Sequence, residues 1–145
     1  GTSGYFGSLR GRGVPISVGG LSAGAVYFME LFDKVASIVS QGHVRRGSFA
    51  AYLPIEHPDI EEFLRIRSEG NPIQEMSFAV CIDDEWMQSM VDGDKEKRKV
   101  WANVIKKRFE TGYPYIFFTD NANKQAPECY KDKNLKIHGS TFIFR

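Results

Sequence analysis

Apolar residues recur at three- and four-residue steps in two long stretches, and this spacing predicts amphipathic helices. The first helix lies within residues 21–42, with Ser22 as its expected N-cap and Gly42 as its expected end. The second lies within residues 92–112 and is expected to end at Gly112. The expected buried sides are Val26, Met29, Phe32, Val35 and Val39 in the first helix, and Val100, Trp101, Val104, Ile105 and Phe109 in the second.

Two shorter helices are predicted between them. One starts at Pro58, which fits a first helical position, and ends at Gly70; acidic residues follow Pro58, as suits the positive end of a helix dipole. Its expected buried residues are Ile60, Phe63, Leu64 and Arg67. The other is capped by Asp83 and carries Trp86, Met87 and Met90.

Three apolar runs predict strands at Gly47–Ile55, Met76–Ile82 and Tyr113–Phe118. The last is apolar enough to predict burial on both faces. Strands that alternate with helices of this length indicate βαβ units and therefore a parallel α/β sheet of three or four strands. A sheet this narrow has exposed edges, so we interpret it as part of a larger sheet.

Composition narrows the classes of function. The 145 residues hold 19 basic and 18 acidic side chains, for a net charge of +1, which argues against a nucleic-acid-binding or membrane-surface protein. No apolar run approaches the length of a membrane-spanning helix. Two cysteines, Cys81 and Cys129, give neither a disulfide framework nor a zinc site. The expectation is a cytoplasmic domain with reduced thiols and no metal.

Two loops carry candidate binding residues. The glycine-rich stretch GSLRGRGVPISVGG holds Arg10 and Arg12 and runs into a predicted helix, an arrangement suited to a phosphate group. It matches no nucleotide-binding motif, so a plain surface loop is the alternative. The second stretch, SQGHVRRGSF, places Arg45 and Arg46 between a helix and a strand. A solvated turn is the alternative there.

A third candidate is GLSAG, which satisfies the GxSxG pattern of serine hydrolases with Ser22 as nucleophile. Such an enzyme would also need a histidine, and His43, His57 and His138 are present. The stretch before Ser22 is too short for a secure strand, so a helix cap is the competing interpretation of this serine.

Three separated stretches resemble one family. SQGHVRRGSFAAYLPIEHPDIEEFLRIRSEGNPIQ, TGYPYIFFTDNAN and YFGSLRGRGVPI resemble the large, catalytic subunit of class I ribonucleotide reductase, in particular phage and bacterial forms, in order from about Tyr5 to Ser140. The resemblance implies a piece of a ten-stranded α/β barrel. It also implies reduction of ribonucleoside diphosphates to deoxyribonucleotides, dimerisation, a radical-generating small subunit, and a deoxynucleoside triphosphate or ATP as specificity effector.

The same resemblance assigns site residues. In the family, the first loop binds effector phosphates through an arginine, which corresponds here to Arg10, and through backbone around Ile16 and Ser17. The second loop links effector to substrate through a glutamine and an arginine. These correspond to Gln41 and Arg45, with Arg46 as the alternative because the loop length differs among members.

The resemblance stops abruptly after Ser140. Where the family carries Asn-Leu-Cys-x-Glu, with its radical cysteine, this chain reads Thr141–Arg145. Neither Cys81 nor Cys129 matches the family's redox pair. We therefore expect one barrel fragment in three parts: an effector loop in residues 1–20, a β/α segment in 21–140 and an aberrant tail in 141–145.

A truncated or frameshifted reading frame, or half of a split gene, would explain that tail. The expected chain has no catalytic residue and no cofactor of its own, and is inactive alone. The alternatives are a nucleotide- or phosphate-binding module without chemistry, and a complementing half of a split subunit.

Overall fold

The computed structural model of the chain describes residues 2–40 and 47–139. Four strands form one sheet in the order β1-β2-β3-β4, and every neighbouring pair is parallel. This confirms the predicted α/β class and its parallel sheet. The strands are β1 (Thr2–Tyr5), β2 (Phe49–Pro54), β3 (Ser77–Ile82) and β4 (Tyr115–Phe118).

Strand β1 was not predicted, because it lies in the stretch interpreted as a glycine-rich loop. Its residue Gly4 pairs with Ala51 of β2. A Cβ atom at Gly4 would lie 3.0 Å from the ring of Phe49 and 3.1 Å from that of Phe6. The glycine therefore leaves space for two aromatic rings. Because glycine is uncommon inside strands, the sequence pattern did not predict a strand here.

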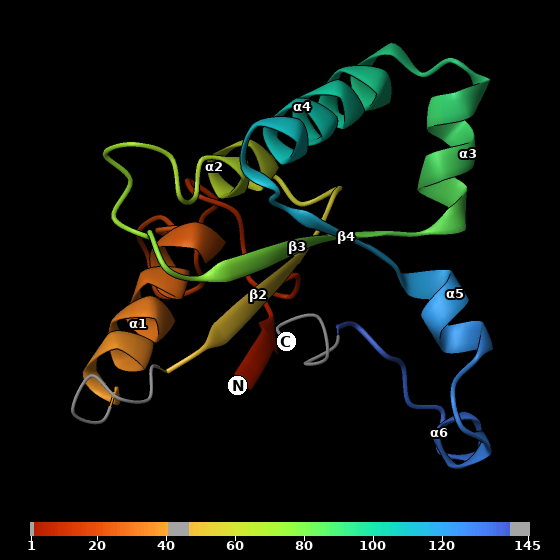
Figure 1. Ribbon diagram of the computed structural model, residues 1–145, viewed down its shortest axis with the longest axis horizontal. Coiled ribbons are helices and arrows are strands. Elements are labelled where there is room, and N and C mark those ends of the chain that lie inside the picture. The colour runs from red at the N-terminus through yellow and green to blue at the C-terminus, as the bar shows by residue number, and fades with distance from the viewer. Residues whose placement is uncertain (1, 41–46, 140–145) are drawn as a thin grey trace.

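Helices connect and flank the strands (Figure 1). Helix α3 was predicted with its start at Asp83 and α4 with nearly the observed ends, whereas α5 and α6 were not predicted. The helices are α1 (Ala25–Ile38), α2 (Ile60–Leu64), α3 (Asp84–Asp92), α4 (Lys95–Thr111), α5 (Thr119–Lys124) and α6 (Glu128–Asp132). No helix in the described ranges is long and apolar enough to cross a membrane.

The predicted Asp83 cap of α3 and Gly112 end of α4 are confirmed, whereas the Asp94 cap of α4 was not predicted. The Asp83 carboxylate accepts a hydrogen bond from the Trp86 N–H at 2.7 Å, and Asp94 does the same for the Lys97 N–H at 3.0 Å. Gly112 ends α4 in the left-handed conformation. Each of these interactions spans three residues or fewer, so the sequence pattern contains both partners.

The predicted cap of α1 is wrong. The N-cap residue is Gly24, with φ of 92°, and it makes no side-chain cap hydrogen bond. Ser22 instead accepts a hydrogen bond from the Gly24 N–H and donates one to the Arg10 carbonyl. Gly42, the predicted end of this helix, lies outside the described residues.

Helix α2 is shorter than predicted, with Asp59 as its N-cap residue and Arg65 as its C-cap residue. Pro58 therefore precedes the helix and does not occupy its first position. Arg67 is half-buried in a turn with φ of 66°, so it does not belong to a helical buried face. Gly70, also at positive φ, lies in that turn.

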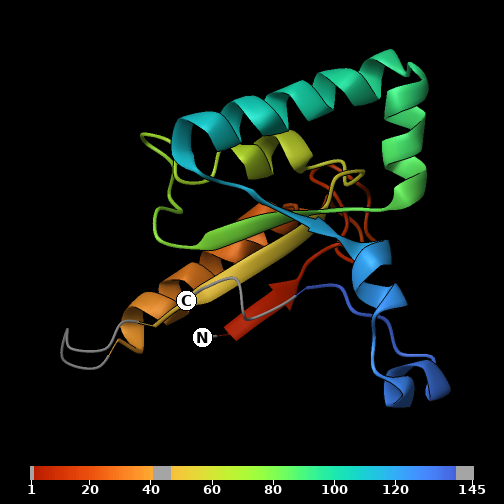
Figure 2. The ribbon, with the colours of Figure 1, turned by 45° about the vertical axis from the view of Figure 1, so that its right-hand side comes forward.

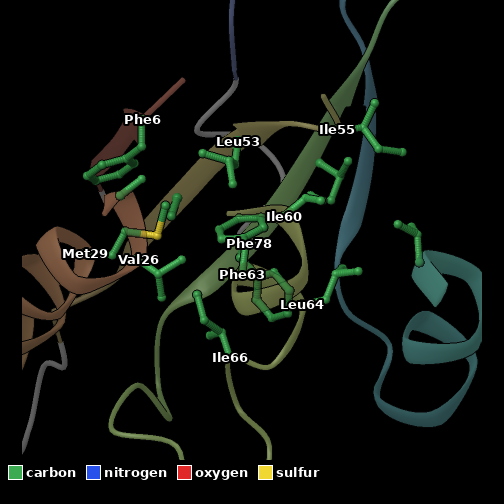
Figure 3. Packing of buried hydrophobic residues seen from close by; sticks show 14 of the residues in the cluster. Phe6, Val26, Met29, Leu53, Ile55, Ile60, Phe63, Leu64, Ile66 and Phe78 are labelled. Atoms are coloured by element: carbon green, nitrogen blue, oxygen red, sulfur yellow. The ribbon is translucent and has the colours of Figure 1, made fainter. Parts of the chain in front are cut away.

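One face of the sheet and the helices packed on it form the main core. Figure 3 shows Phe63 of α2 against Phe78 of β3, with Met29 and Val26 of α1 on one side and Leu64 on the other. The Phe63 and Phe78 rings meet edge to face, with centroids 5.2 Å apart. In Figure 2, α2 and α4 lie on this side of the sheet. Burial of these large apolar side chains is the main contribution to the stability of the fold.

Two predictions about buried faces are wrong in part. In α4, Val104 is fully buried and Val100 and Trp101 are partly buried, but Ile105 is 41% and Phe109 is 91% exposed. In α1, Val26 and Met29 are buried, whereas Val35 and Val39 are exposed. In both α1 and α4, fewer apolar residues are buried than the periodic pattern predicts.

Strand β4 was predicted to be buried on both faces, and this is also wrong. Tyr115, Ile116 and Phe117 are partly exposed, and Phe118 is 41% exposed. Within the described ranges β4 is an outer strand of the sheet, so it pairs on one side only. The described part of the chain therefore leaves several apolar side chains of β4 partly exposed.

The second face of the sheet is lined by small and aromatic residues, Ala50, Tyr52, Ala79 and Cys81. The stretch after α6 returns toward β2 on this face (Figure 1). A Cβ atom at Gly139 would lie 2.8 Å from the Tyr52 ring. The backbone of residue 139 therefore rests directly on that ring.

Candidate functional site

A cleft of about 660 Å³ opens at the carboxyl ends of the four strands. Tyr5, Pro54, Cys81 and Thr119, at or next to those ends, line it together with Arg10. Crevices at this edge of open parallel sheets are the usual ligand positions of α/β proteins. Arg10, a predicted site residue, therefore lies at the edge of the sheet where α/β proteins usually bind ligands.

The loop between β1 and α1 forms one wall of the cleft and folds back on itself as a hairpin. Pro15 and Leu21 form an antiparallel bridge, and the Ser22 N–H donates to the Val14 carbonyl at 2.8 Å. At the tip, the Ile16 N–H donates to the Gly20 carbonyl at 3.1 Å. The hairpin thus holds Ile16 and Ser17, both predicted effector contacts, in a defined turn beyond Arg10.

The Arg10 side chain is exposed, and hydrogen bonds within the loop hold both its guanidinium group and its backbone. Its Nη1 donates to the Pro15 carbonyl at 2.7 Å, and its own carbonyl accepts a hydrogen bond from Ser22 Oγ at 3.2 Å. Its other guanidinium N–H groups make no hydrogen bond to the described part of the chain. A planar group with several exposed donors is suited to phosphate or carboxylate oxygens.

Arg12 was the second arginine proposed for phosphate binding. Its Nη2 lies 3.2 Å from Glu62 Oε1 of α2, with both side chains accessible to solvent. An exposed pair of this kind contributes little to stability, roughly 0–1 kcal/mol. Arg12 is therefore partly neutralised, and Arg10 is the arginine of this loop without an acidic partner in the described ranges.

Two buried side chains of the β2–α2 connection hold this loop. The His57 ring lies 2.8 Å, through Nε2, from the Leu9 carbonyl, and Nδ1 accepts the Asp59 N–H at 3.1 Å. The Asp59 carboxylate accepts the Arg12 N–H at 2.9 Å through Oδ1 and the Ala25 N–H at 2.8 Å through Oδ2. From the sequence, His57 was considered as a histidine available to a hydrolase, and Asp59 as one of the acidic residues that follow Pro58. Their contacts to the loop were missed because the partners are 34 to 48 residues away.

The opposite wall carries Cys81 and His138. Cys81 Sγ donates to the His138 carbonyl at 3.4 Å, and the His138 ring stacks on Tyr5 with centroids 4.4 Å apart. Burial raises the pKa of the Cys81 thiol to about 12. Burial and, to a lesser degree, Cys81 also raise the pKa of the Tyr5 hydroxyl. Both groups are therefore protonated at neutral pH, and this wall carries no thiolate nucleophile.

The second predicted loop cannot be placed. Gln41, Arg45 and Arg46 lie outside the described residues, as do Gly42 and His43. The residues that flank this loop are described: Ser40 Oγ accepts the Gly47 N–H at 3.0 Å and donates to the Ala36 carbonyl of α1. The loop therefore starts and ends beside the last turns of α1, whereas Arg10 lies near the first turn.

The hydrolase interpretation of Ser22 is wrong. A nucleophile elbow needs a strand that runs directly into the serine turn, but Ser22 follows the hairpin, and β1 ends at Tyr5. The Ser22 hydroxyl is engaged with the Arg10 carbonyl and the Gly24 N–H. In the described ranges it makes no hydrogen bond to a histidine. Those ranges also hold no group of three or more acidic, histidine or cysteine side chains placed to bind a metal ion.

The parallel sheet, its helices and the cleft at its carboxyl edge define a parallel α/β protein. A sequence model of the ribonucleotide reductase barrel domain matches residues 1–97. The chain belongs to the ribonucleotide reductase family, as a segment of its barrel domain. This confirms the resemblance found in the sequence.

Individual relatives agree. The chain is 34% identical to the vitamin B12-dependent ribonucleoside-diphosphate reductase of Mycobacterium tuberculosis (strain CDC 1551 / Oshkosh), over 88% of this chain and 21% of that protein. It is 28% identical to the ribonucleoside-diphosphate reductase large subunit of Invertebrate iridescent virus 6, over 92% of this chain and 17% of the viral protein.

A solved structure extends the match to nearly the whole chain. The alpha subunit of the Actinobacillus ureae class Id ribonucleotide reductase is 48% identical, with a TM-score of 0.87, over 97% of this chain and 25% of that subunit. The chain thus spans about a quarter or less of these three relatives. Its four strands correspond to part of the larger barrel, as the exposed outer strands suggested.

Proposed function

We propose that this chain is the effector-binding segment of a ribonucleotide reductase large subunit. In this proposal the loop between β1 and α1 binds the phosphates of a deoxynucleoside triphosphate or ATP. Arg10 contacts the phosphates, and the backbone at Ile16 and Ser17 contacts the nucleotide. The main observation in support is the exposed guanidinium of Arg10, which is anchored to the loop backbone and lines the cleft at the carboxyl ends of the strands.

The chain by itself is expected to bind nucleotide without reducing it. The two thiols in the described ranges do not form a redox pair: Cys81 is buried, and Cys129 is on the exposed helix α6. Reduction of ribonucleoside diphosphates, in support of DNA precursor synthesis in the cytoplasm, would then belong to the complete subunit. That subunit would work with a radical-generating small subunit.

Dimerisation would complete the site. The 14 residues of α1 span about 21 Å at 1.5 Å per residue, and they separate Arg10 from the stretch that holds Gln41, Arg45 and Arg46. Two copies with antiparallel α1 helices would bring the first loop of one chain to the second loop of the other. An exposed apolar face of α1, formed by Tyr27, Leu31, Val35 and Ile38, supports this arrangement.

Nucleotide-dependent thermal stability tests the proposal. The chain is melted alone and with dTTP, dGTP, dATP or ATP, with inorganic triphosphate as the ligand control. A ligand that binds only the folded state at ~100 times its dissociation constant adds about 2.7 kcal/mol to the free energy of unfolding. A shift that depends on the base, and that Arg10→Ala removes, is the expected result. Arg65→Ala, which removes an exposed arginine of α2, is the matched control and should keep the shift.

Two results would contradict the proposal: no stabilisation by any of the four nucleotides, or a shift as large with inorganic triphosphate. Sedimentation with and without nucleotide addresses the dimer separately. Leu31→Asp should keep the chain monomeric and abolish any nucleotide-induced association, because it places a charge on the apolar face of α1.

A further inference from the structure

We propose that His57 and Asp59 are positioning residues for the effector loop: they fix its backbone on both sides of Arg10 and tie it to the first turn of α1. The inference rests on the proposed role of Arg10 in nucleotide binding. It adds two residues of the connection between β2 and α2 to a site that the family resemblance confined to two other loops.

Hydrogen bonds from His57 and Asp59 hold the loop backbone on both sides of Arg10. His57 binds the backbone at Leu9, immediately before Arg10, and Asp59 binds it at Arg12, two residues after. The second oxygen of Asp59 binds Ala25, the first residue of α1. Arg10 is thus enclosed by contacts that all originate from one three-residue stretch, 57–59.

Glycines allow the approach. A Cβ atom at Gly11 would lie 2.9 Å from the Cβ of Pro58, and one at Gly24 would lie 2.8 Å from Asp59 Oδ2. The loop backbone therefore packs directly against the stretch at both ends, as only glycine permits at such distances. The glycines of this loop have a packing role in addition to their role in the turn.

Burial makes these contacts strong. The side chains of His57 and Asp59 are 3% and 5% exposed. A buried carboxylate must have its oxygens satisfied, and here both accept backbone N–H groups of the loop and of α1. Its negative charge also lies at the positive end of the α1 dipole. Movement of the loop away from this stretch would take the Arg12 N–H away from a buried carboxylate oxygen, which opposes loop movement.

The geometry also assigns the His57 tautomer. Nδ1 faces the Asp59 N–H, which can only donate, and Nε2 faces the Leu9 carbonyl, which can only accept. These two contacts fit the tautomer that carries its proton on Nε2. An asparagine at position 57 can keep an acceptor for the Asp59 N–H but is too short to reach Leu9, which makes it an informative substitution.

The test is a double-mutant cycle on nucleotide affinity with the full 145-residue chain. The dissociation constant of dTTP is measured for the unaltered chain, Arg10→Ala, Asp59→Asn and the double variant. Asparagine has one acceptor oxygen in place of two, so one of the two contacts that tie the loop to α1 is lost, and affinity should fall roughly tenfold. If Asp59 acts through Arg10, Arg10→Ala should cost much less in the Asp59→Asn background than in the unaltered chain.

Two further measurements separate positioning from stability. Amide exchange at Arg12, followed without ligand, should accelerate in Asp59→Asn while exchange in β2 and β3 is unchanged. Asp94→Asn removes a similar helix-capping carboxylate, at α4, and should leave dTTP affinity unchanged. If Asp59→Asn does not fold, His57→Asn replaces it in the cycle, with a smaller loss of affinity and the same non-additivity expected.

The outcomes are distinguishable. Binding by the unaltered chain, weakened by Arg10→Ala and additively by Asp59→Asn, overturns this inference and leaves the proposed function intact. An Asp59→Asn chain with a lower melting temperature but the original dissociation constant does the same, because it shows a structural role alone. No binding of dTTP, or of the other three nucleotides, by the unaltered chain overturns the proposed function and this inference with it.

Discussion

The thiol of Cys81 donates a hydrogen bond to the carbonyl of His138, 57 residues further along the chain, with a sulfur–oxygen distance of 3.4 Å. This contact joins β3 to the stretch that returns across the second face of the sheet. The thiol is consequently buried, and its pKa is raised to about 12 because burial disfavours the thiolate.

The two cysteines should therefore differ sharply in reactivity. With iodoacetamide at pH 8 under native conditions, Cys129 on exposed α6 is expected to be alkylated, whereas Cys81 reacts only after unfolding. Peptide mass spectrometry of the labelled chain measures both sites. Rapid native labelling of Cys81 would show that the stretch containing His138 does not cover it in solution.

Cys81 should also make the fold less stable at alkaline pH. Its pKa is raised from 9.0 to about 12 on folding, so below pH 9 its thiol is protonated in both states and this contribution is fully present. As pH rises from 9 toward 12, the unfolded state loses its proton first, and stability decreases. Denaturant melts across this range should show a smaller decrease for Cys81→Ala. Parallel curves for the two proteins would contradict this.

Gly47 marks the tight entry into β2. A Cβ atom there would lie 2.4 Å from the Ala36 carbonyl oxygen, a backbone atom of α1. Gly47→Ala must push α1 away from the sheet and should cost roughly 1–3 kcal/mol in the free energy of unfolding. The neighbouring, exposed Ser48→Ala is the control and should remain within about 0.5 kcal/mol of the original. Urea denaturation of both variants makes the comparison.

Substitutions at two apolar residues of α4, Val104 and Phe109, should also differ in their cost to the free energy of unfolding. Val104 is fully buried against the core, so Val104→Ala is expected to cost roughly 1–3 kcal/mol through lost burial and a residual cavity. Phe109 is 91% exposed, so Phe109→Ala should change stability by less than about 0.5 kcal/mol. Fluorescence of Trp86, which is buried in α3, reports unfolding. A large cost at Phe109 would mean that the face of α4 that carries it is covered in solution.

The candidate site was only partly predictable. The glycine-rich pattern singled out Arg10, and the family resemblance added Ile16 and Ser17. The structure places Arg10 at the cleft and the other two in the hairpin that follows it, and their role as effector contacts stays a prediction. Gln41, Arg45 and Arg46 lie outside the described residues, so their role stays a prediction. His57 and Asp59 could not be assigned to the loop, because no local pattern connects a helix start to a backbone N–H 34 or more residues away.

The sequence alone determined the alternation of strands and helices, the parallel α/β class, the Asp83 cap of α3 and the Gly112 end of α4. These depend on periodicity and on partners within a few residues, such as Asp83 and Trp86. Tertiary structure decided which apolar side chains are covered, that residues 2–5 form a strand, and that Asp59 rather than Ser22 binds the first turn of α1. The physical reason is that burial and long-range hydrogen bonds depend on which distant segments meet. Residues such as Phe109 carry the same apolar signal whether or not another surface covers them.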